Sequence, residues 1–266
     1  MSRGGAIAIF ARTPGLGPVK TRLAADIGAQ QARAFHRLAI AATAETVRRF
    51  VTAHPAWTAR FAVAEAEGVG DAFWRPFPAR HTGGGDLATR LWRVSEALLA
   101  VHGRAILIGA DSPQIIPADL EAAAAALERH AWVLGPAADG GFWCCGLARP
   151  LPRAVWRAAP FDRHADGSSA RVAAALIDAA RAAGFPPPAR LRRLHDVDTA
   201  DDLDRLAGEW PDPAAESPQQ ARLKAWIAAL RARSAPARRH GLRDGVKAAP
   251  AVGPGPCALF RAPPSV

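Results

Sequence analysis

A glycine-containing loop with basic side chains follows the first apolar run of the chain. The loop spans residues 12–22 and holds Gly15, Gly17, Arg12, Lys20 and Arg22. Glycines let backbone N–H groups approach phosphate oxygens, and a helix N-terminus with neighbouring Lys and Arg side chains favours an anion. The Lys20-Thr21 pair resembles the end of a P-loop, but Val19 stands where that motif requires its second glycine. The loop therefore predicts phosphate binding by Arg12, Gly17, Lys20 and Arg22, with a solvated basic turn as the alternative.

A second glycine-rich loop, Gly83 to Gly85, precedes Asp86 and a helical pattern. Three consecutive glycines indicate close approach of the backbone to a ligand. Gly85, Asp86 and Arg90 are therefore candidate nucleotide-binding residues. The alternative is structural, because Asp86 can equally serve as the N-cap of the helix with Arg90 as its exposed partner.

Aspartates follow several of the predicted strands. Asp111 comes after the apolar strand Ala105 to Gly109, where an acid is well placed to hold a Mg²⁺ or Mn²⁺ ion that bridges phosphate oxygens; its alternative role is to cap the turn before Pro113. Asp196 and Asp198 alternate along one strand end, so both carboxylates could face the same pocket, or one could cap the next helix.

Asp139 precedes Gly140 and Gly141. It is a candidate acceptor contact or general base, or a turn residue, and the pattern does not separate these roles. His195 is more typical of a structural histidine than of a catalytic one.

Alternating strand and helix patterns must position these loops. Short apolar runs predict strands at residues 5–11, 58–64, 105–109, 132–134, 142–147 and 190–197, and helical periodicity predicts helices at 19–50, 86–99 and 117–130. Pro117 fits a helix start, and Thr199 with Asp202 resembles a helix cap. The economical arrangement is a single α/β domain with a mainly parallel sheet flanked by helices, in which ligands collect at the carboxyl ends of the strands.

The character of the chain changes after Trp210. We expect a folded domain over residues 1–210, a linker with an amphipathic helix over 211–233, and a disordered tail rich in Pro, Ala and Gly over 234–266. The formal net charge is +10, and residues 217–266 carry nine Lys or Arg against the single acid Asp244. Nucleic-acid binding is therefore expected, if at all, only through this tail.

Cysteine content and hydropathy indicate a cytoplasmic enzyme. No apolar run reaches the roughly 20 residues of a membrane span, and the first apolar run is too short for the core of a signal peptide. The three cysteines, with Cys144 and Cys145 adjacent, provide neither a disulfide framework nor the spacing of a zinc site.

Taken in order, these motifs resemble a known family. The segments around Arg12, Gly85, Asp111, Asp139 and Asp198 look like the bacterial DUF2064 family, whose members have been labelled arsenosugar-biosynthesis or radical-SAM-associated glycosyltransferases. Their order is also similar to that of phospholactate guanylyltransferases and, more distantly, molybdenum-cofactor guanylyltransferases. The resemblance covers residues 5 to about 207. It implies a nucleotide-diphospho-sugar transferase fold of GT-A type, with Arg12, Lys20 and Arg22 toward the phosphates and Asp111 and Asp198 toward the metal.

The sequence departs from the family pattern near the acceptor end. Ala138 stands where an acid is usual, and Phe142 replaces a Tyr, so the ring is kept and its hydroxyl is lost. Ala159 to Asp162 occupy the place of an expected Trp-Ser/Thr pair. The leading hypothesis is a metal-dependent glycosyltransferase that moves a sugar from a nucleotide-diphosphate donor to a small-molecule acceptor. A nucleotidyltransferase that releases pyrophosphate and a non-catalytic nucleotide-binding protein are the alternatives.

Overall fold

A seven-stranded sheet forms the centre of the computed structural model, which describes residues 4–161 and 171–234. The strand order is β3-β2-β1-β4-β6-β5-β7, and β6 runs antiparallel to both of its neighbours while the other pairings are parallel. The mainly parallel sheet predicted from the sequence is therefore confirmed. The strands are β1 (Gly5–Ala11), β2 (Trp57–Val63), β3 (Ala79–His81), β4 (Ala105–Gly109), β5 (Trp132–Pro136), β6 (Phe142–Leu147) and β7 (Ala189–Arg190).

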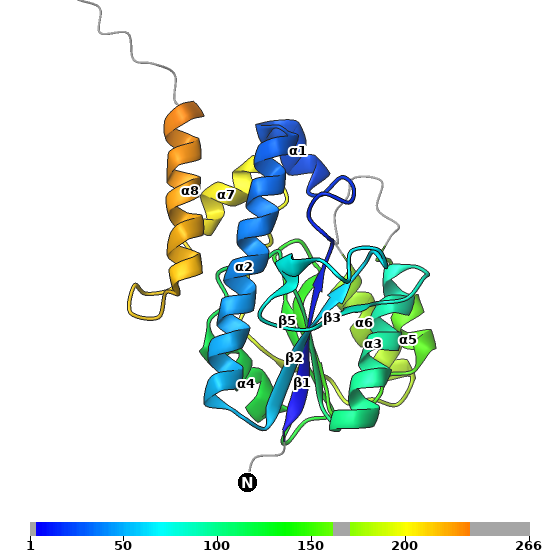
Figure 1. The fold of residues 1–266 in the computed structure, drawn as a ribbon. Coiled ribbons are helices and arrows are strands. Elements are labelled where there is room, and N and C mark those ends of the chain that lie inside the picture. Colours follow the sequence, from blue (N-terminus) through cyan, green and yellow to red (C-terminus); the bar gives the residue numbers. More distant parts are fainter. Residues whose placement is uncertain (1–3, 162–170, 235–266) are drawn as a thin grey trace, which may run out of the picture.

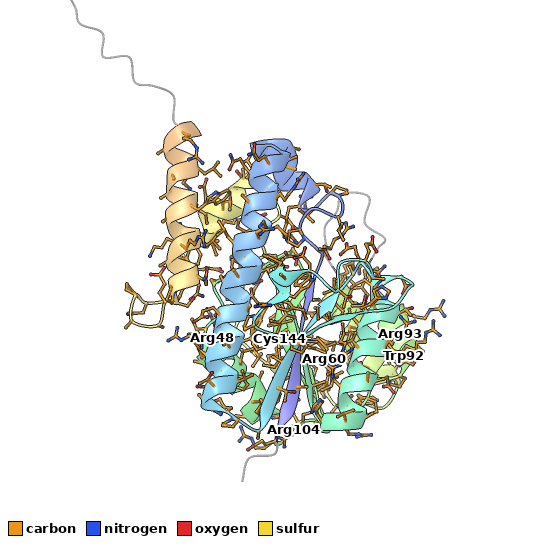
Figure 2. The ribbon with its side chains drawn as sticks, in the orientation of Figure 1. Arg48, Arg60, Trp92, Arg93, Arg104 and Cys144 are labelled. Carbon is orange, nitrogen blue, oxygen red and sulfur yellow. The ribbon has the colours of Figure 1, made fainter. Side chains whose placement is uncertain are left out.

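Helices cover both faces of the sheet (Figure 1). The described helices are α1 (Thr21–Ile27), α2 (Ala29–Ala53), the 3₁₀ turn η1 (Ala72–Trp74), α3 (Leu87–His102), α4 (Pro117–Ala126), α5 (Arg153–Ala158), α6 (Val172–Ala182), α7 (Ala200–Leu206) and α8 (Pro218–Ser234). Side-chain alternation along β1 divides the core. Ile7 and Ile9 join the core beneath α2 and α4, whereas Ala6 and Ala8 join the core beneath α3, α5 and α6. Cys144 is fully buried in the middle of the sheet (Figure 2).

The single helix expected over residues 19–50 is two helices. Lys20 has a left-handed backbone conformation with φ 51°, which starts α1, and Gly28 with φ 88° separates α1 from α2. Glycine tolerates this conformation without steric cost, so the chain can turn there. Each helix packs an apolar face inward, so the apolar periodicity continues across Gly28. The sequence pattern therefore does not reveal the break between α1 and α2.

The predicted helix starts are confirmed. The Asp86 carboxylate accepts the Thr89 N–H at 2.8 Å, and Thr199 and Asp202 form a reciprocal capping box at the start of α7. The strand expected over 190–197 is shorter, because regular pairing with β5 ends at Arg190 and resumes only as an isolated bridge between Ala137 and Leu194.

The last helix, α8, lies alongside α2 (Figure 1). Leu223, Ile227 and Leu230 are buried in a third core with residues of α1, α2 and α7. Ser217 and Gln220 begin the helix with reciprocal hydrogen bonds, and both side chains are buried. Helix α8 thus contributes to the hydrophobic core.

The part of the tail after residue 234, with the nucleic-acid contact suggested for it, lies outside the described residues. None of the helices over residues 4–161 and 171–234 is long and apolar enough to cross a membrane.

Candidate functional site

The loop after β1 is fixed to the end of β2 by one carboxylate. Glu65 accepts the Arg12 Nε–H at 2.9 Å and the Thr13 backbone N–H at 2.7 Å. A second Arg12 nitrogen donates to the Pro18 carbonyl at 3.0 Å, which closes the loop on itself. Gly17 has φ 145°, and a β-carbon there would lie 3.3 Å from the Arg12 guanidinium. The glycine therefore lets Arg12 fold across the loop. Glu65 has no motif of its own, and sequence reasoning missed it.

The Lys20 ammonium bridges two aspartates from distant parts of the chain. Its Nζ lies 2.8 Å from Asp111 Oδ1, in the loop after β4, and 2.7 Å from Asp198 Oδ1, just before α7. The Lys20 side chain is only 6% exposed, whereas those of Asp111 and Asp198 are 49% and 39% exposed. The lysine thus lies beneath the carboxylates, which face solvent. The sequence predicted that Lys20 belongs to this site and contacts phosphates. In the structure it contacts Asp111 and Asp198, the two candidate metal ligands.

The opposite charges of Lys20 and the two aspartates act on the pKa values in this cluster against the effect of burial. Burial by itself lowers the pKa of Lys20, but the carboxylates of Asp111 and Asp198 outweigh burial and hold that pKa above its ordinary value. Burial alone raises the pKa of Asp111, yet the Lys20 ammonium beside it holds it below its ordinary value. One ammonium thus faces the side chains of two acids, so the cluster has fewer basic than acidic groups.

The two aspartates fit a divalent cation. Their oxygens already converge on one cation, the Lys20 ammonium. Mg²⁺ prefers carboxylate oxygens and is commonly bound by one or two of them together with substrate phosphates. Within the described part of the chain, no group of three or more His, Cys, Asp or Glu side chains could hold a metal ion. Two carboxylates would leave most coordination positions of such an ion for water or a ligand.

A large basic cavity opens in front of Asp111 and Asp198. Its volume is about 840 Å³, and loops at the carboxyl ends of β1, β2, β3 and β4 line it. The basic side chains in its wall are Arg12, Lys20, Arg22 and Arg90. This is the edge of the sheet at which ligands of open α/β folds bind. The structure thus brings four sequence-predicted site residues to one cavity with Asp111 and Asp198; we call it the basic chamber.

Gly85 and Asp86 shape the rim of this chamber without lining it. Asp86 caps α3, so its carboxylate is engaged by Thr89. Asp86 and Arg90 do not form the expected ion pair among the described residues; instead the Arg90 Nε–H donates to the Gly85 carbonyl at 2.9 Å. Gly85 has φ 103°, and a β-carbon there would crowd the Thr89 side chain at 3.2 Å. These residues hold Arg90 at the chamber wall.

His36 lies in the wall of the basic chamber, on α2. Its Nε2–H donates to the Arg12 carbonyl at 3.0 Å, and its buried Nδ1 has no hydrogen-bond partner within the described residues. Burial, with the nearby charges of Lys20 and Arg12, lowers the pKa of His36. The ring is therefore neutral at physiological pH and holds the first loop from behind.

A smaller cavity of about 210 Å³ adjoins the basic chamber. Phe10, Leu87 and Asp111 belong to the walls of both, so the two cavities meet at Asp111. The remaining walls of this apolar chamber come mainly from hydrophobic side chains, with Gly141 and Asp196 beside them. Asp196 and Asp198 were expected on one side of a strand facing one pocket. The structure places Asp198 in the basic chamber and Asp196 in the apolar chamber.

Asp196 has an environment unlike that of Asp111. The Ser112 hydroxyl donates to its Oδ1 at 2.8 Å. Burial and the neighbouring Asp139 carboxylate raise the pKa of Asp196 to about 7. Asp139 itself accepts the Gly141 N–H at 2.9 Å and does not line either chamber. Asp139 thus sits in the turn that holds Gly140 and Gly141 beside the apolar chamber.

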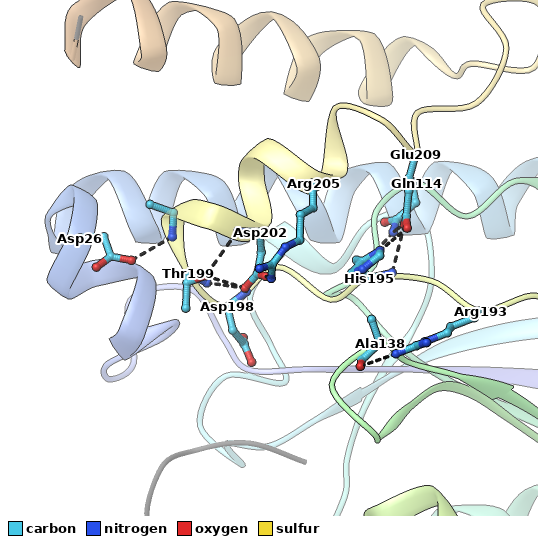
Figure 3. A network of polar contacts seen from close by, with 11 residues as sticks. Asp26, Gln114, Ala138, Arg193, His195, Asp198, Thr199, Asp202, Arg205 and Glu209 are labelled. Carbon is cyan, nitrogen blue, oxygen red and sulfur yellow. Dashed lines mark hydrogen bonds and ion pairs between the residues drawn. The ribbon is translucent and has the colours of Figure 1, made fainter. Parts of the chain in front are cut away.

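A polar network behind the chambers joins the segments that carry the aspartates (Figure 3). The buried Gln114 amide donates to the His195 carbonyl at 2.8 Å and to Glu209 at 2.9 Å, and the His195 ring pairs with Glu209. The Val197 N–H donates to the Asp111 carbonyl at 3.0 Å. His195 therefore has a structural role.

The Asp202 carboxylate accepts hydrogen bonds from the backbone N–H groups of Asp198 and Thr199, and it thereby caps α7. The Asp198 side chain is left to pair with Lys20. Helix α8 also contacts the loop that follows Asp111: the Gln220 side-chain amide donates to the carbonyls of Pro113 at 2.9 Å and Ile115 at 2.8 Å. The loop that carries Asp111 is thereby held by α8 as well as by the network.

Comparison with protein families covers just over half of the chain. The family described as an uncharacterized protein conserved in bacteria, DUF2064, matches residues 25–163. The chain belongs to the DUF2064 family. The match includes Asp111, Arg90 and Asp139, but it begins after Lys20 and ends before Asp198. No curated protein matches the chain.

Solved structures establish the fold of this DUF2064 protein. A structure from Desulfovibrio desulfuricans G20, assigned as a nucleotide-diphospho-sugar transferase, is 23% identical, covers 87% of this chain and 98% of that chain, and has a TM-score of 0.70. CMP:2-keto-3-deoxy-manno-octonic acid synthetase complexed with CTP is 13% identical, covers 77% and 97%, and has a TM-score of 0.46. The 4-diphosphocytidyl-2C-methyl-D-erythritol synthase of Anaerococcus prevotii DSM 20548 is 11% identical, covers 77% and 95%, and has a TM-score of 0.47. The last two are more distant, and the first confirms the expected nucleotide-diphospho-sugar transferase fold.

Proposed function

We propose that this protein is a metal-dependent glycosyltransferase, which moves a sugar from a nucleotide-diphosphate donor to a small-molecule acceptor. One observation carries the proposal: Asp111 stands where a basic chamber and an apolar chamber meet, and its carboxylate converges with that of Asp198 on the Lys20 ammonium. A transferase needs two adjoining binding spaces with the reacting bond between them.

We assign the phosphates and the metal to the basic chamber and the acceptor to the apolar chamber. In the basic chamber, Arg12, Arg22 and Arg90 would bind the phosphates, with Gly17, Gly85 and Asp86 shaping the loops around them. Lys20 would join them once a metal replaces its ammonium between Asp111 and Asp198. Asp111 and Asp198 would hold Mg²⁺ or Mn²⁺, and a metal there would neutralise charge on the diphosphate leaving group. At the other chamber, Gly140 and Gly141 would contact the acceptor.

The proposed reaction moves one group between two oxygens. The acceptor hydroxyl oxygen forms a bond to the anomeric carbon of the sugar while the bond from that carbon to the β-phosphate oxygen breaks, and a nucleoside diphosphate leaves. The hydroxyl proton passes to a carboxylate at the acceptor end. Asp139 is our candidate base from the sequence, and it would have to leave its hydrogen bond with the Gly141 N–H to reach the chamber. Asp196, which faces the apolar chamber, is a second carboxylate at that end.

Nucleotidyl transfer is the second candidate, and the arginines of the basic chamber favour it. Arg12, Arg22 and Arg90 with Lys20 are the basic side chains that would contact a triphosphate in this chamber. In that reaction the acceptor would attack the α-phosphorus of a triphosphate, and pyrophosphate would leave. A third possibility is nucleotide binding without turnover.

Thermal unfolding with and without Mg²⁺ tests the metal and the nucleotide together. We expect nucleotides or nucleotide sugars to stabilise the protein in the presence of Mg²⁺, by about 2.7 kcal/mol at a ligand concentration one hundred times Kd. Asp111→Asn keeps the shape of the side chain and should abolish the metal-dependent part. Asp178→Asn, an exposed acid on α6, is the matched control and should keep it. A full metal-dependent shift in Asp111→Asn would overturn the metal assignment.

Product analysis separates the reactions. Nucleoside diphosphate released from a nucleotide sugar with acceptor present supports glycosyl transfer, whereas pyrophosphate released from GTP or another triphosphate supports nucleotidyl transfer. Metal-dependent binding with neither product, over a full panel of donors and acceptors, would favour the binding protein.

A further inference from the structure

The apolar chamber has walls that select a ligand by shape and polarity. Its aromatic side chains are Phe10, Phe142 and Phe161, and the rings of Phe142 and Phe161 meet edge to face with centroids 6.0 Å apart. Leu87 and Leu91 of α3 complete the hydrophobic wall. The volume of about 210 Å³ lies below the roughly 300–1,000 Å³ of most pockets for drug-sized ligands. A ligand there must be compact and largely apolar.

The charge in this chamber is negative. Its titratable wall residues are Asp111 and Asp196, and none of the described side chains that line it is basic. The Lys20 ammonium beside Asp111 is paired with Asp111 and Asp198. A carboxylate or phosphate placed there would lose its hydration without gaining a partner among the basic side chains of the described residues, and in the metal-free protein it would face at least the Asp111 carboxylate.

The polar groups in the chamber suit a hydroxyl. Asp196 already accepts the Ser112 hydroxyl, and its second oxygen provides a further hydrogen-bonding position. Asp111 lies at the junction with the basic chamber, so a hydroxyl near it would point toward the proposed donor. The apolar body of the ligand would then rest against the phenylalanine and leucine side chains.

We propose that the apolar chamber is the acceptor site and that the acceptor is a compact, uncharged alcohol with an apolar body. The inference rests on the proposed transferase function and restricts its acceptor class. Alcohols that also carry a phosphate or carboxylate are excluded from this chamber.

A matched pair of probes tests the charge rule directly. Benzyl alcohol and benzoate have nearly the same size and shape and differ by one negative charge. Their binding to the full chain is measured by ligand-observed NMR titration, with and without Mg²⁺ and a nucleoside diphosphate. We expect the alcohol to bind at least about tenfold more tightly than benzoate, because a buried unpaired anion is costly.

Variants of the wall locate the binding. Phe142→Lys introduces a cation into the apolar chamber and should reverse the preference toward benzoate, whereas Phe142→Leu, the neutral control, should keep it. If Phe142→Lys does not fold, Leu87→Lys at the start of α3 makes the same test, because Leu87 is 38% exposed. The inference is overturned if the intact protein binds benzoate as tightly as the alcohol, if it binds neither probe, or if the folded lysine variant shows no change.

The two proposals fail in different ways. Binding of the nucleoside diphosphate is measured on the same protein preparations, from the rise in thermal unfolding temperature that the nucleotide causes. Intact nucleotide binding without a preference for the alcohol overturns the acceptor inference alone. A clear preference for the alcohol without any nucleotide binding overturns the proposed function and leaves an alcohol-binding chamber.

Discussion

Asp111 and Asp119 both follow β4, yet they pair with basic side chains in different ways. Asp119, at the start of α4, is 7% exposed and receives two hydrogen bonds from Arg192, at 2.5 and 2.7 Å, as well as the Ile116 N–H. Asp111 is 49% exposed and shares a single ammonium with Asp198. One pair is closed and balanced, whereas the other is open and has fewer basic than acidic groups.

The difference distinguishes a carboxylate that protein groups have fully paired from one that is left open to a ligand. A carboxylate whose hydrogen-bonding positions are filled by protein groups has little capacity left for a ligand. Half-exposed carboxylates over a buried lysine can exchange that lysine for another cation. The comparison therefore predicts that changes to the closed pair affect stability alone, and that changes to the open cluster affect stability in a way that metal can reverse.

The largest effect is expected at the closed pair. Arg192→Met leaves the buried Asp119 carboxylate without its bidentate partner, and we expect a loss of about 3 kcal/mol in the free energy of unfolding. This is the lower end of the usual range, because the Arg192 side chain is 43% exposed. Urea unfolding measures the loss, and the affinity for nucleotide should stay within about twofold.

Arg181→Met is the control for that variant, because it breaks an exposed pair with Asp178 and should cost at most about 1 kcal/mol. Equal losses in the two variants would show that the Asp119–Arg192 pair contributes no more than a surface pair.

A smaller effect is expected at the open cluster. Lys20→Met removes the cation between Asp111 and Asp198 and should lower the free energy of unfolding by about 1–3 kcal/mol in the absence of metal. Millimolar Mg²⁺ should restore part of that loss, since a second cation then faces the same carboxylates. Unfolding titrations with Mg²⁺ and with EDTA measure the restoration.

Mg²⁺ should give no such restoration in Arg192→Met. If Mg²⁺ stabilises both variants equally, or neither, the distinction between an open and a closed cluster fails.

The smallest effect concerns pH and His36. The unfolded chain protonates this histidine near its ordinary pKa of 6.5, whereas in the folded protein burial, with Lys20 and Arg12 nearby, lowers that pKa despite the opposing Asp111 charge. Between the two values the unfolded state binds more protons, so this part of the stability is present above pH 6.5 and is lost as pH falls below it. We expect His36→Gln to flatten the decline in unfolding free energy between about pH 7 and 5 by up to about 1 kcal/mol. An unchanged slope would contradict the neutral, buried histidine.

The sequence predicts the parts of this protein that depend on local patterns. The apolar runs of β1 and β4, the caps at Asp86 and Thr199, and the loops at the carboxyl ends of the strands could all be placed before the structure. Basic and acidic loop residues were expected at one site, and Arg12, Lys20, Asp111 and Asp198 do line one chamber.

Long-range pairing could not be predicted in the same way. Lys20 finds its partners 91 and 178 positions along the chain, and no local pattern specifies that it contacts acids in place of solvent. Glu65 gave no sign of its role because its contacts with Arg12 and Thr13 depend on the pairing of β1 with β2. The division of Asp196 and Asp198 between two chambers depends on the irregular path after β7, where strand alternation ceases to apply.

Gln220 has a consequence for the order in which the protein assembles during synthesis. The carbonyls of Pro113 and Ile115, next to Asp111, receive hydrogen bonds from a side chain that the ribosome adds more than one hundred residues later. With synthesis at about 5–20 residues per second, several seconds pass between the synthesis of this loop and that of Gln220, during which the loop lacks these hydrogen bonds. The two-chamber site therefore reaches its final shape only after α8 has left the ribosome and docked on α2.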